Sequence, residues 1–450
     1  EDALSTSVRS AVEDGREGHV VVATYSPRAD TLIDELEARD VGYVLVEPDS
    51  ERATKLYEDG YDVVRADPET VQGLEDANLG RARALVADVS DRVDTSIVLT
   101  ARGISDEIRI VSVVEDPDKT GYHELAGADE VLSPRPLLGK QLAEVASTGL
   151  TTELGEDIEI GRDFEIAELL IHNGSPLAGT SLAESNLREQ AVVNVIGAWF
   201  RGEFVSPVAP DRVLDAGTVL LLTGKSEQIE RLESLPESTV REFESGGTLV
   251  LGHGEVGQAV TRTLDAAGQV YSVIDQEDGP GVDVVGSADD VDTLHAAGID
   301  DARSVILAIP DDTEAEFATL VIRDMSPTLD IAARTESAET VQKMYRAGAN
   351  YVLSLAQVTG RMTASAVLED ETIVAMDGQI EILKTTAPAV AGQTLADARI
   401  RERTGCTVVA VDRDGEVFTD LGADFRIEAG DELVIAGTEA GTTAFVDRLS

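Results

Sequence analysis

The sequence predicts an α/β protein with two Rossmann-like parallel-sheet domains, each followed by a small α+β C-terminal module. Short apolar runs alternate with amphipathic helical stretches in both halves of the chain, which is typical of doubly wound parallel sheets. The two halves repeat each other at a constant spacing. One half also carries a glycine-rich turn between a strand and a helix, at the place where such sheets bind ligands.

The repeat is visible in motifs separated by fixed distances. The segment at 127–133 (GADEVLS) matches the segment at 348–354 (GANYVLS), and two further pairs of segments keep the same spacing. In the smaller modules, Gly202, Gly217 and Gly224 pair at another constant spacing with glycines of the second half, namely Gly415, Gly430 and Gly437. Because several positions keep one spacing in each set, we interpret the chain as a tandem duplication.

Apolar periodicity places the elements within each copy. In the first copy it predicts strands at 19–23, 43–47, 62–65, 84–88, 109–114 and 130–132. In the second copy it predicts a helix over 258–267 and strands at 271–275 and 329–333. Each small module is expected to contain a helix near 182–189 (395–403), a hairpin turn at Arg201-Gly202 (Asp414-Gly415) and a last strand at 218–223 (432–436).

These elements divide the chain into five segments. We expect a linker or polar helix at 1–17, followed by a Rossmann-like domain at 18–150 that has lost its glycine motif. A small module at 151–240 comes next, then a second Rossmann-like domain at 241–372 with the motif intact, and a second small module at 373–450. For brevity the four folded segments are called N1, C1, N2 and C2.

Composition limits the environment and the partners. The 450 residues include 86 acidic and 36 basic side chains, for a net charge of −50 spread along the chain. This pattern predicts a salt-loving source, where charge repulsion is screened over roughly 3 Å at molar salt. Such a field repels phosphate backbones, so we expect no nucleic-acid partner. The single cysteine, Cys406, rules out a disulfide within the chain, which suits a reducing cytoplasm. No apolar run approaches the roughly 20 residues that span a bilayer.

The glycine motif of N2 is suited to a dinucleotide or an adenine nucleotide. Gly252 permits a tight turn, Gly254 lets the backbone approach a phosphate, and Gly257 lets the helix pack closely on the strand. The helix that follows offers free N–H groups to an anion. The predicted binding segment is Gly252, His253, Gly254, Glu255, Val256 and Gly257. The alternative is that Gly252 and Gly257 serve packing alone.

Two further side chains are predicted to complete this site. Asp275 ends the second strand of N2, eighteen residues after Gly257, where a carboxylate usually bonds the ribose hydroxyls. Arg334 follows the predicted strand at 329–333, and a guanidinium there could hold two phosphate oxygens at once. A surface arginine paired with one of the many carboxylates is the alternative for Arg334.

N1 lacks these features. Ala23, Tyr25 and Arg28 stand at its three glycine positions, and Val113 stands where N2 has Arg334. A β-carbon at the second glycine position obstructs a pyrophosphate, so we expect no dinucleotide there in the usual pose. The edge of this sheet instead carries the carboxylates of Asp88, Asp91, Glu115 and Asp116. Such oxygens could ligate a divalent cation at Asp88 and Glu115, with a solvated acidic surface as the alternative.

Catalysis has little support in the sequence. The five histidines are scattered without metal-ligand spacing, and no Ser/His/Asp order or catalytic cysteine context is evident. The small modules leave little room for a substrate domain. An NAD-dependent oxidoreductase is therefore the rival of another class, and a structural oligomerisation module with empty sites is a third hypothesis.

Over essentially its full length the chain resembles the RCK family, the regulators of potassium conductance. The resemblance rests on the glycine strand and turn at 247–257, on the turn at 127–134 (GADEVLSP) before an expected crossing helix, and on the module opening at 177–183 (LAGTSLA). In that family, N-domains are Rossmann-like and C-domains are small α+β modules.

The resemblance implies ligands and residue roles. Gly252, Gly254, Gly257, Asp275 and Arg334 match the nucleotide positions of the family, whose N-domains take NAD(H), ATP or ADP. Asp88 and Glu115 fall where calcium-gated relatives have ligating carboxylates, although Val113 replaces one acid of that set. Family members assemble into rings, so a homo-oligomeric ring, expected as a tetramer, is the implied state.

The resemblance also implies two settings. One is the cytoplasmic ligand-sensing region of a potassium channel, at the inner face of the cell membrane and attached to the pore. The other is the peripheral subunit of a Trk-type potassium uptake system, beside its membrane subunit. The glycine-poor N1, the segment at 1–17 before the first strand and the absence of an initiator Met favour the channel region.

Overall fold

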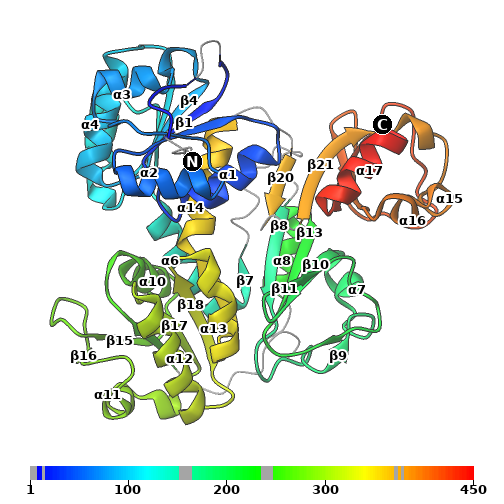
Figure 1. Ribbon diagram of the computed structural model, residues 1–450. Helices are drawn as coiled ribbons and strands as arrows, with labels where there is room; N and C mark the ends of the chain where they lie inside the picture. Colours follow the sequence, from blue (N-terminus) through cyan, green and yellow to red (C-terminus); the bar gives the residue numbers. More distant parts are fainter. Residues whose placement is uncertain (1–7, 13–15, 152–164, 235–246, 369–372, 377–379) are drawn as a thin grey trace, which may run out of the picture. The chain divides into compact units, whose positions relative to one another are not determined.

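The computed structural model describes residues 8–12, 16–151, 165–234, 247–368, 373–376 and 380–450 (Figure 1). The chain divides into two compact units, each formed from two segments. One unit comprises Glu1–Leu138 with Ser354–Glu369, and the other comprises Gly139–Leu353 with Asp370–Ser450. The five-segment division proposed from the sequence stays a prediction. None of the described helices combines the length and the apolar character that a membrane span requires.

The first sheet has the strand order β3-β2-β1-β4-β5-β6, and its strands are parallel. Nearly every residue of its central strands is buried, as expected where helices cover both faces of a parallel sheet. The strands are β1 (Val20–Ala23), β2 (Tyr43–Val46), β3 (Val63–Val64), β4 (Ala84–Ala87), β5 (Arg109–Val113) and β6 (Glu130–Leu132). The helices are α1 (Ala29–Glu37), α2 (Ser50–Glu58), α3 (Val71–Asp76), α4 (Asp91–Arg102), α5 (Thr120–Ala126) and α6 (Pro134–Thr148).

The second sheet repeats this order as β16-β15-β14-β17-β18-β19. Its strands are β14 (Thr248–Leu251), β15 (Tyr271–Asp275), β16 (Val284–Val285), β17 (Ser304–Leu307), β18 (Asp330–Thr335) and β19 (Tyr351–Ser354). Its helices are α10 (Glu255–Ala266), α11 (Val291–Ala296), α12 (Asp312–Met325), α13 (Val341–Ala347) and α14 (Leu355–Leu368). The predicted pair of Rossmann-like domains is confirmed, because in both sheets the order reverses beside the first strand of the copy.

The two long crossing helices are exchanged between the repeats. Helix α14 follows the last strand of the second sheet, yet it packs along α1 and contributes Ala364, Val367 and Leu368 to the core of the first unit. At Gly360 the fit is close, since a β-carbon there would lie 2.5 Å from the Cβ of Thr31. Its counterpart Gly139, in α6, lies equally close to the backbone of α10. Glycine at both positions therefore lets each helix pack against the other repeat.

Each small module is an antiparallel sheet flanked by helices. The strand orders are β11-β10-β13-β8-β7 in C1 and β20-β21-β24-β22-β23 in C2. In C1 the elements are β7 (Leu150–Thr151), β8 (Glu165–Leu170), β9 (Thr180–Ser181), α7 (Leu187–Ala191), β10 (Asn194–Phe200), β11 (Glu203–Val205), β12 (Val213–Leu214), β13 (Thr218–Gly224) and α8 (Ser226–Ser234). In C2 they are β20 (Ile373–Met376), β21 (Ile380–Thr386), α15 (Leu395–Ala398), α16 (Ile400–Thr404), β22 (Thr407–Arg413), β23 (Glu416–Phe418), β24 (Glu432–Gly437) and α17 (Glu439–Leu449).

Most predicted elements are confirmed to within two residues, including both hairpins. In each hairpin the two turn residues have positive φ, as a type I′ turn requires. Three predictions were wrong in detail. The helix expected over 258–267 begins three residues earlier, at Glu255. The helix expected near 182–189 begins only at Leu187, and its counterpart in C2 is broken at Arg399, whose φ is +45°. Strand β18 continues through Thr335 rather than ending at 333.

The segment before β1 is only partly described. Arg9 forms an isolated bridge to Val64, so this part of the chain runs beside β3. Residues 1–7 and 13–15, on which the expected linker or polar helix also falls, lie outside the described residues.

Candidate functional site

The glycine turn of N2 joins β14 to α10, and two of its glycines are required by packing. Gly252 has a φ of +94°, and a β-carbon there would lie 3.1 Å from the carbonyl of Ala308. At Gly257 a β-carbon would lie 2.0 Å from the carbonyl oxygen of Gly252, closer than any real contact. The turn therefore brings the start of α10 against the end of β14, which is the geometry of a phosphate-binding turn.

Gly254 has a different environment. It is the N-cap of α10, with no side chain capping the helix, and its φ of −67° is open to any residue. A β-carbon at this position would meet no atom within 4 Å. The N-terminus of a twelve-residue helix thus adjoins open space at Gly254, and a helix N-terminus is a favourable place for a phosphate. A side chain at residue 254 would fill that space without disturbing the packing of the protein.

Asp275 lies beside this turn, as the sequence predicts. Its Oδ2 accepts a hydrogen bond of 2.6 Å from the N–H of His253, and its Oδ1 accepts one of 2.9 Å from the N–H of Glu277. A carboxylate offers about four acceptor positions, so the same side chain can hold the turn and still bond a ribose hydroxyl. The residues of the predicted segment contribute unequally: Val256 is buried in the core, and the ring of His253 lies against Gly281.

Arg334 does not follow its strand but lies within it. The residue is the fifth of β18 and only 3% exposed, and its guanidinium pairs with Glu336. Its Nε is buried without a hydrogen-bond partner among the described residues. A buried guanidinium at the carboxyl end of a strand, held by one carboxylate, can serve a phosphate as a preformed clamp. The role of Arg334 as a phosphate ligand stays a prediction.

In N1 the corresponding turn is filled by side chains of the protein itself. Glu47 takes the place of Asp275 and accepts the N–H groups of Tyr25, at 3.4 Å, and of Asp49, at 3.0 Å. Arg28, at the third glycine position, directs its Nε to Asp88 Oδ2 at 2.8 Å. At the third glycine position N1 therefore carries a partly buried ion pair.

Each of the two carboxylates proposed for a metal in N1 faces an arginine. Asp88 pairs with Arg28, and Glu115 faces Arg135, with 3.7 Å between Oε1 and Nη2. Throughout the described ranges, no group of three His, Cys, Asp or Glu residues has a geometry that could hold a metal ion. The divalent-cation site at Asp88 and Glu115 stays a prediction, and in this arrangement an arginine neutralises each of its carboxylates.

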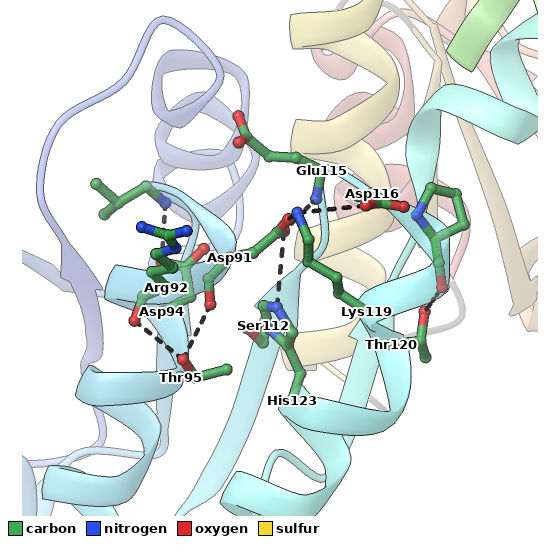
Figure 2. Close-up of polar contacts among 12 residues, drawn as sticks. Asp91, Arg92, Asp94, Thr95, Ser112, Glu115, Asp116, Lys119, Thr120 and His123 are labelled. Carbon is green, nitrogen blue, oxygen red and sulfur yellow. Dashed lines mark hydrogen bonds and ion pairs between the residues drawn. The ribbon is translucent and has the colours of Figure 1, made fainter.

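A buried polar network, which the sequence did not indicate, lies at the same sheet edge (Figure 2). The Oγ of Ser112 lies 2.8 Å from His123 Nδ1, and the other ring nitrogen lies 3.7 Å from Asp91 Oδ1. Asp91 also accepts a hydrogen bond of 2.7 Å from Lys119 Nζ. A serine, a histidine and an aspartate thus meet, but Ser112 and His123 are fully buried, so no substrate can reach them. Burial lowers the pKa of His123, which keeps its ring neutral near pH 7.

Asp94, in α4, is a buried carboxyl group close to this network. It has no exposed surface, its Oδ1 accepts the N–H of Val89 at 2.9 Å, and its Oδ2 has no partner in the described part of the chain. Burial, reinforced by the charges of Asp88 and Asp91, raises the pKa of Asp94 to about 8. The side chain is consequently protonated in the folded protein at neutral pH.

We expect Asp94→Asn to remove a pH-dependent loss of stability. In the unfolded chain Asp94 ionises near pH 4, whereas the folded protein keeps the proton until about pH 8. The free energy of unfolding therefore falls between these values, by at most about 1.4 kcal/mol per pH unit from this group. Asparagine mimics the protonated form, so the variant should match the wild type at pH 4 and exceed its stability at pH 9. Chemical denaturation across this range measures the difference, and parallel curves for the two proteins would contradict the assignment.

The fold and the glycine turn together define a duplicated pair of Rossmann-like domains with one intact nucleotide-type turn. The TrkA-N domain model matches residues 20–134 and 248–355, and the TrkA-C domain model matches residues 166–236 and 380–450. The chain therefore belongs to the proteins with tandem TrkA-N and TrkA-C domains, which are the RCK proteins. The resemblance inferred from the sequence is confirmed.

Individual relatives extend this family assignment. A segment of 227 residues is 27% identical to the "Probable potassium channel protein 2" of Methanocaldococcus jannaschii, and it spans 48% of this chain and 66% of that protein, just under two thirds of its length. The crystal structure of the GsuK RCK domain is 29% identical, with a TM-score of 0.68 over 98% of this chain and 97% of the other. The structure of the GsuK channel bound to NAD is 29% identical, with a TM-score of 0.67 over 99% of this chain and 81% of the other.

Proposed function

We propose that the chain is the cytoplasmic ligand-sensing region that gates a potassium channel, and that a nucleotide bound at N2 is the signal. The observation that carries the proposal is the turn at Gly252–Gly257, where two glycines are fixed by packing and Gly254 faces open space at a helix N-terminus. The "Probable potassium channel protein 2" of M. jannaschii supports the setting, and the GsuK channel bound to NAD supports both the setting and the class of ligand. The proposed role is regulatory rather than catalytic.

The residues present fit an adenine dinucleotide such as NAD(H), and equally the phosphates of ATP or ADP. The backbone N–H groups at the start of α10 would receive the phosphates, Asp275 would bond a ribose hydroxyl, and Arg334 would pair with a phosphate oxygen. To bind a phosphate, the Arg334 guanidinium would have to give up its ion pair with Glu336. The bound nucleotide supplies charge and contact area, and no chemical step is assigned to it.

Gating requires that the nucleotide bind one state of the assembly more tightly than the other. The chain offers a direct route, because β19 of N2 continues into α14, which is packed into the core of the first unit. We propose that ligand binding at N2 shifts this helix and that N1, adjoining the pore, transmits the shift. The proposed assembly is a homo-oligomeric ring, because the movements of all its subunits then act together on one pore.

Gly254→Asp is expected to abolish nucleotide binding while leaving the fold intact. The new carboxylate would occupy the open space at the start of α10 and repel phosphate, lowering affinity at least about 100-fold, or roughly 3 kcal/mol. Thermal unfolding in molar KCl, with NAD, NADH, ATP, ADP and calcium added separately, measures this. One nucleotide should raise the Tm of the wild type and not that of the variant.

The same experiment separates the alternatives. A Tm increase with calcium alone would support the N1 carboxylates Asp88 and Glu115 as the sensing site. No increase with any ligand would contradict the proposal and favour a structural oligomerisation module. Turnover of NADH with small carbonyl compounds would instead indicate an oxidoreductase.

A peripheral subunit of a Trk-type potassium uptake system is the second candidate function, favoured by the match to TrkA-N and TrkA-C domain models in both halves of the chain. Co-purification of the intact native protein distinguishes the two settings. A pore covalently continuous with this chain supports the channel, whereas a separate membrane subunit supports the uptake system.

A further inference from the structure

A small, partly open cavity lies at the altered glycine turn of N1, between the turn after β1 and the crossing helix α14. Its volume is about 10 Å³, which is the space that the centre of one water molecule needs. Apolar side chains of β1, β4 and α1 form part of the wall. The polar part is formed by Thr24, Ser26, Arg28, Asp88, Thr359 and Thr363.

The polar wall is specific to the first copy. Arg28 replaces Gly257 in the alignment of segment 18–28 with segment 247–257, and Asp88 replaces Ile309 in the register that aligns 127–133 with 348–354. The same register places Thr359 and Thr363 of α14 opposite two fully buried leucines of α6, Leu138 and Leu142. Each of these four polar residues therefore has a glycine or apolar residue at the matching position of the other copy. All four polar residues line one cavity. Such a correlated change indicates a built polar site rather than a packing defect.

One of these groups lacks a partner. Thr359 is 1% exposed, and its Oγ1 has no hydrogen bond within the described residues, whereas Thr363 Oγ1 donates to the carbonyl of Thr359 at 2.8 Å. A buried hydroxyl without a partner is costly, and the great majority of such groups in proteins are satisfied. The Oδ2 of Asp88 accepts from Arg28 at 2.8 Å and lies 3.5 Å from Ser26 Oγ, which is a weak contact.

We propose that this cavity binds a single water molecule that links Thr359 of α14 to Asp88 and Ser26 of N1. A water there finds the two to four polar partners that a buried water requires, and it gives the hydroxyl of Thr359 its hydrogen bond. The guanidinium of Arg28 beside Asp88 disfavours a metal cation at the same point. The altered turn of N1 thereby contacts α14, the helix that follows the last strand of N2, through this water molecule.

The test compares Thr359→Val, which keeps the shape of the side chain and removes the hydroxyl, with the wild-type chain. Loss of the bridging water should lower the Tm and increase hydrogen exchange of the amides of α14. A crystal structure at a resolution that shows ordered water should place one water within hydrogen-bond distance of Thr359 Oγ1 in the wild type, and none in the variant.

Thr319→Val is the matched control. Thr319 is also a buried helical threonine, but its Oγ1 donates to the carbonyl of Ala315 at 2.7 Å, within its own helix. This variant should leave exchange in α14 unchanged. A Thr359→Val protein more stable than the wild type would overturn the proposal, because it would mean that the cavity is dry and the hydroxyl unsatisfied. Anomalous scattering from rubidium at this position, in crystals grown with that ion, would also overturn it.

Discussion

Gly257→Ala is expected to unfold the second Rossmann-like domain. The new β-carbon would lie 2.0 Å from the carbonyl oxygen and 2.9 Å from the carbonyl carbon of Gly252, and both are backbone atoms. They cannot move without separating α10 from β14, whose contact surfaces are buried. Overpacking of a core commonly costs about 1–3 kcal/mol, and a clash with fixed backbone should exceed that range. Far-ultraviolet circular dichroism and hydrogen exchange of 248–266 measure the loss.

A matched variant makes this result interpretable. Gly254→Ala changes a glycine of the same turn where a β-carbon meets no atom, so its melting curve should overlay that of the wild type. If Gly257→Ala melted together with Gly254→Ala, the close contact between α10 and β14 would be wrong.

Asp330→Ala is expected to break the contact between C1 and N2 and to lower the stability of the protein. Asp330 begins β18, and its carboxylate accepts from His172 Nδ1 at 2.8 Å and from the backbone and side-chain amides of Asn173 at 3.2 and 3.0 Å. His172 is 2% exposed, so truncation of its partner leaves buried donors without an acceptor. Breaking a buried pair in this way typically costs about 3–5 kcal/mol. Hydrogen exchange in β8 and β18, together with chemical denaturation, measures the change.

Asp300→Ala is the control for this substitution. It removes a histidine partner of the same kind, since His295 Nδ1 lies 2.8 Å from Asp300 Oδ2, but the two side chains are 48% and 72% exposed. Exposed pairs contribute about 0–1 kcal/mol, so the stability should barely change. Equal losses for the two variants would show that the link between C1 and N2 contributes nothing beyond a surface contact.

The duplicated architecture could be predicted from the sequence because the patterns that indicate it are local or periodic. Buried parallel strands are continuous apolar runs, so β1, β4 and β5 stand out, and the hairpin at Asp414-Gly415 follows from residues that accept positive φ. The glycine turn and Asp275 could be predicted for the same reason. Each lies at the end of a strand whose limits the apolar run defines.

Contacts between segments that are distant in the sequence could not be predicted from such local patterns. The position of Arg334 was missed because β18 continues two residues beyond its apolar run, and a buried arginine resembles a polar residue after the strand. The network of Asp91, Ser112 and His123 joins a helix, a strand and another helix, with no spacing to signal it. Comparison of the copies offers a partial signal, since Ala333 and Met344 stand opposite Ser112 and His123. Paired polar replacements of this kind mark residues in contact.

The exchange of α14 also has a consequence during synthesis on the ribosome. The face of α1 that α14 covers includes Leu32 and Leu36, and it emerges early in translation. The helix that completes this core is made roughly 220 residues after the first sheet, which takes on the order of ten to forty seconds at ordinary elongation rates. Throughout that interval the face of α1 that α14 covers in the folded chain lacks that helix. Transient chaperone binding to ribosome-bound chains ending near residue 340, and its loss in chains long enough for residue 368 to have left the ribosome, would be the signature of this delay.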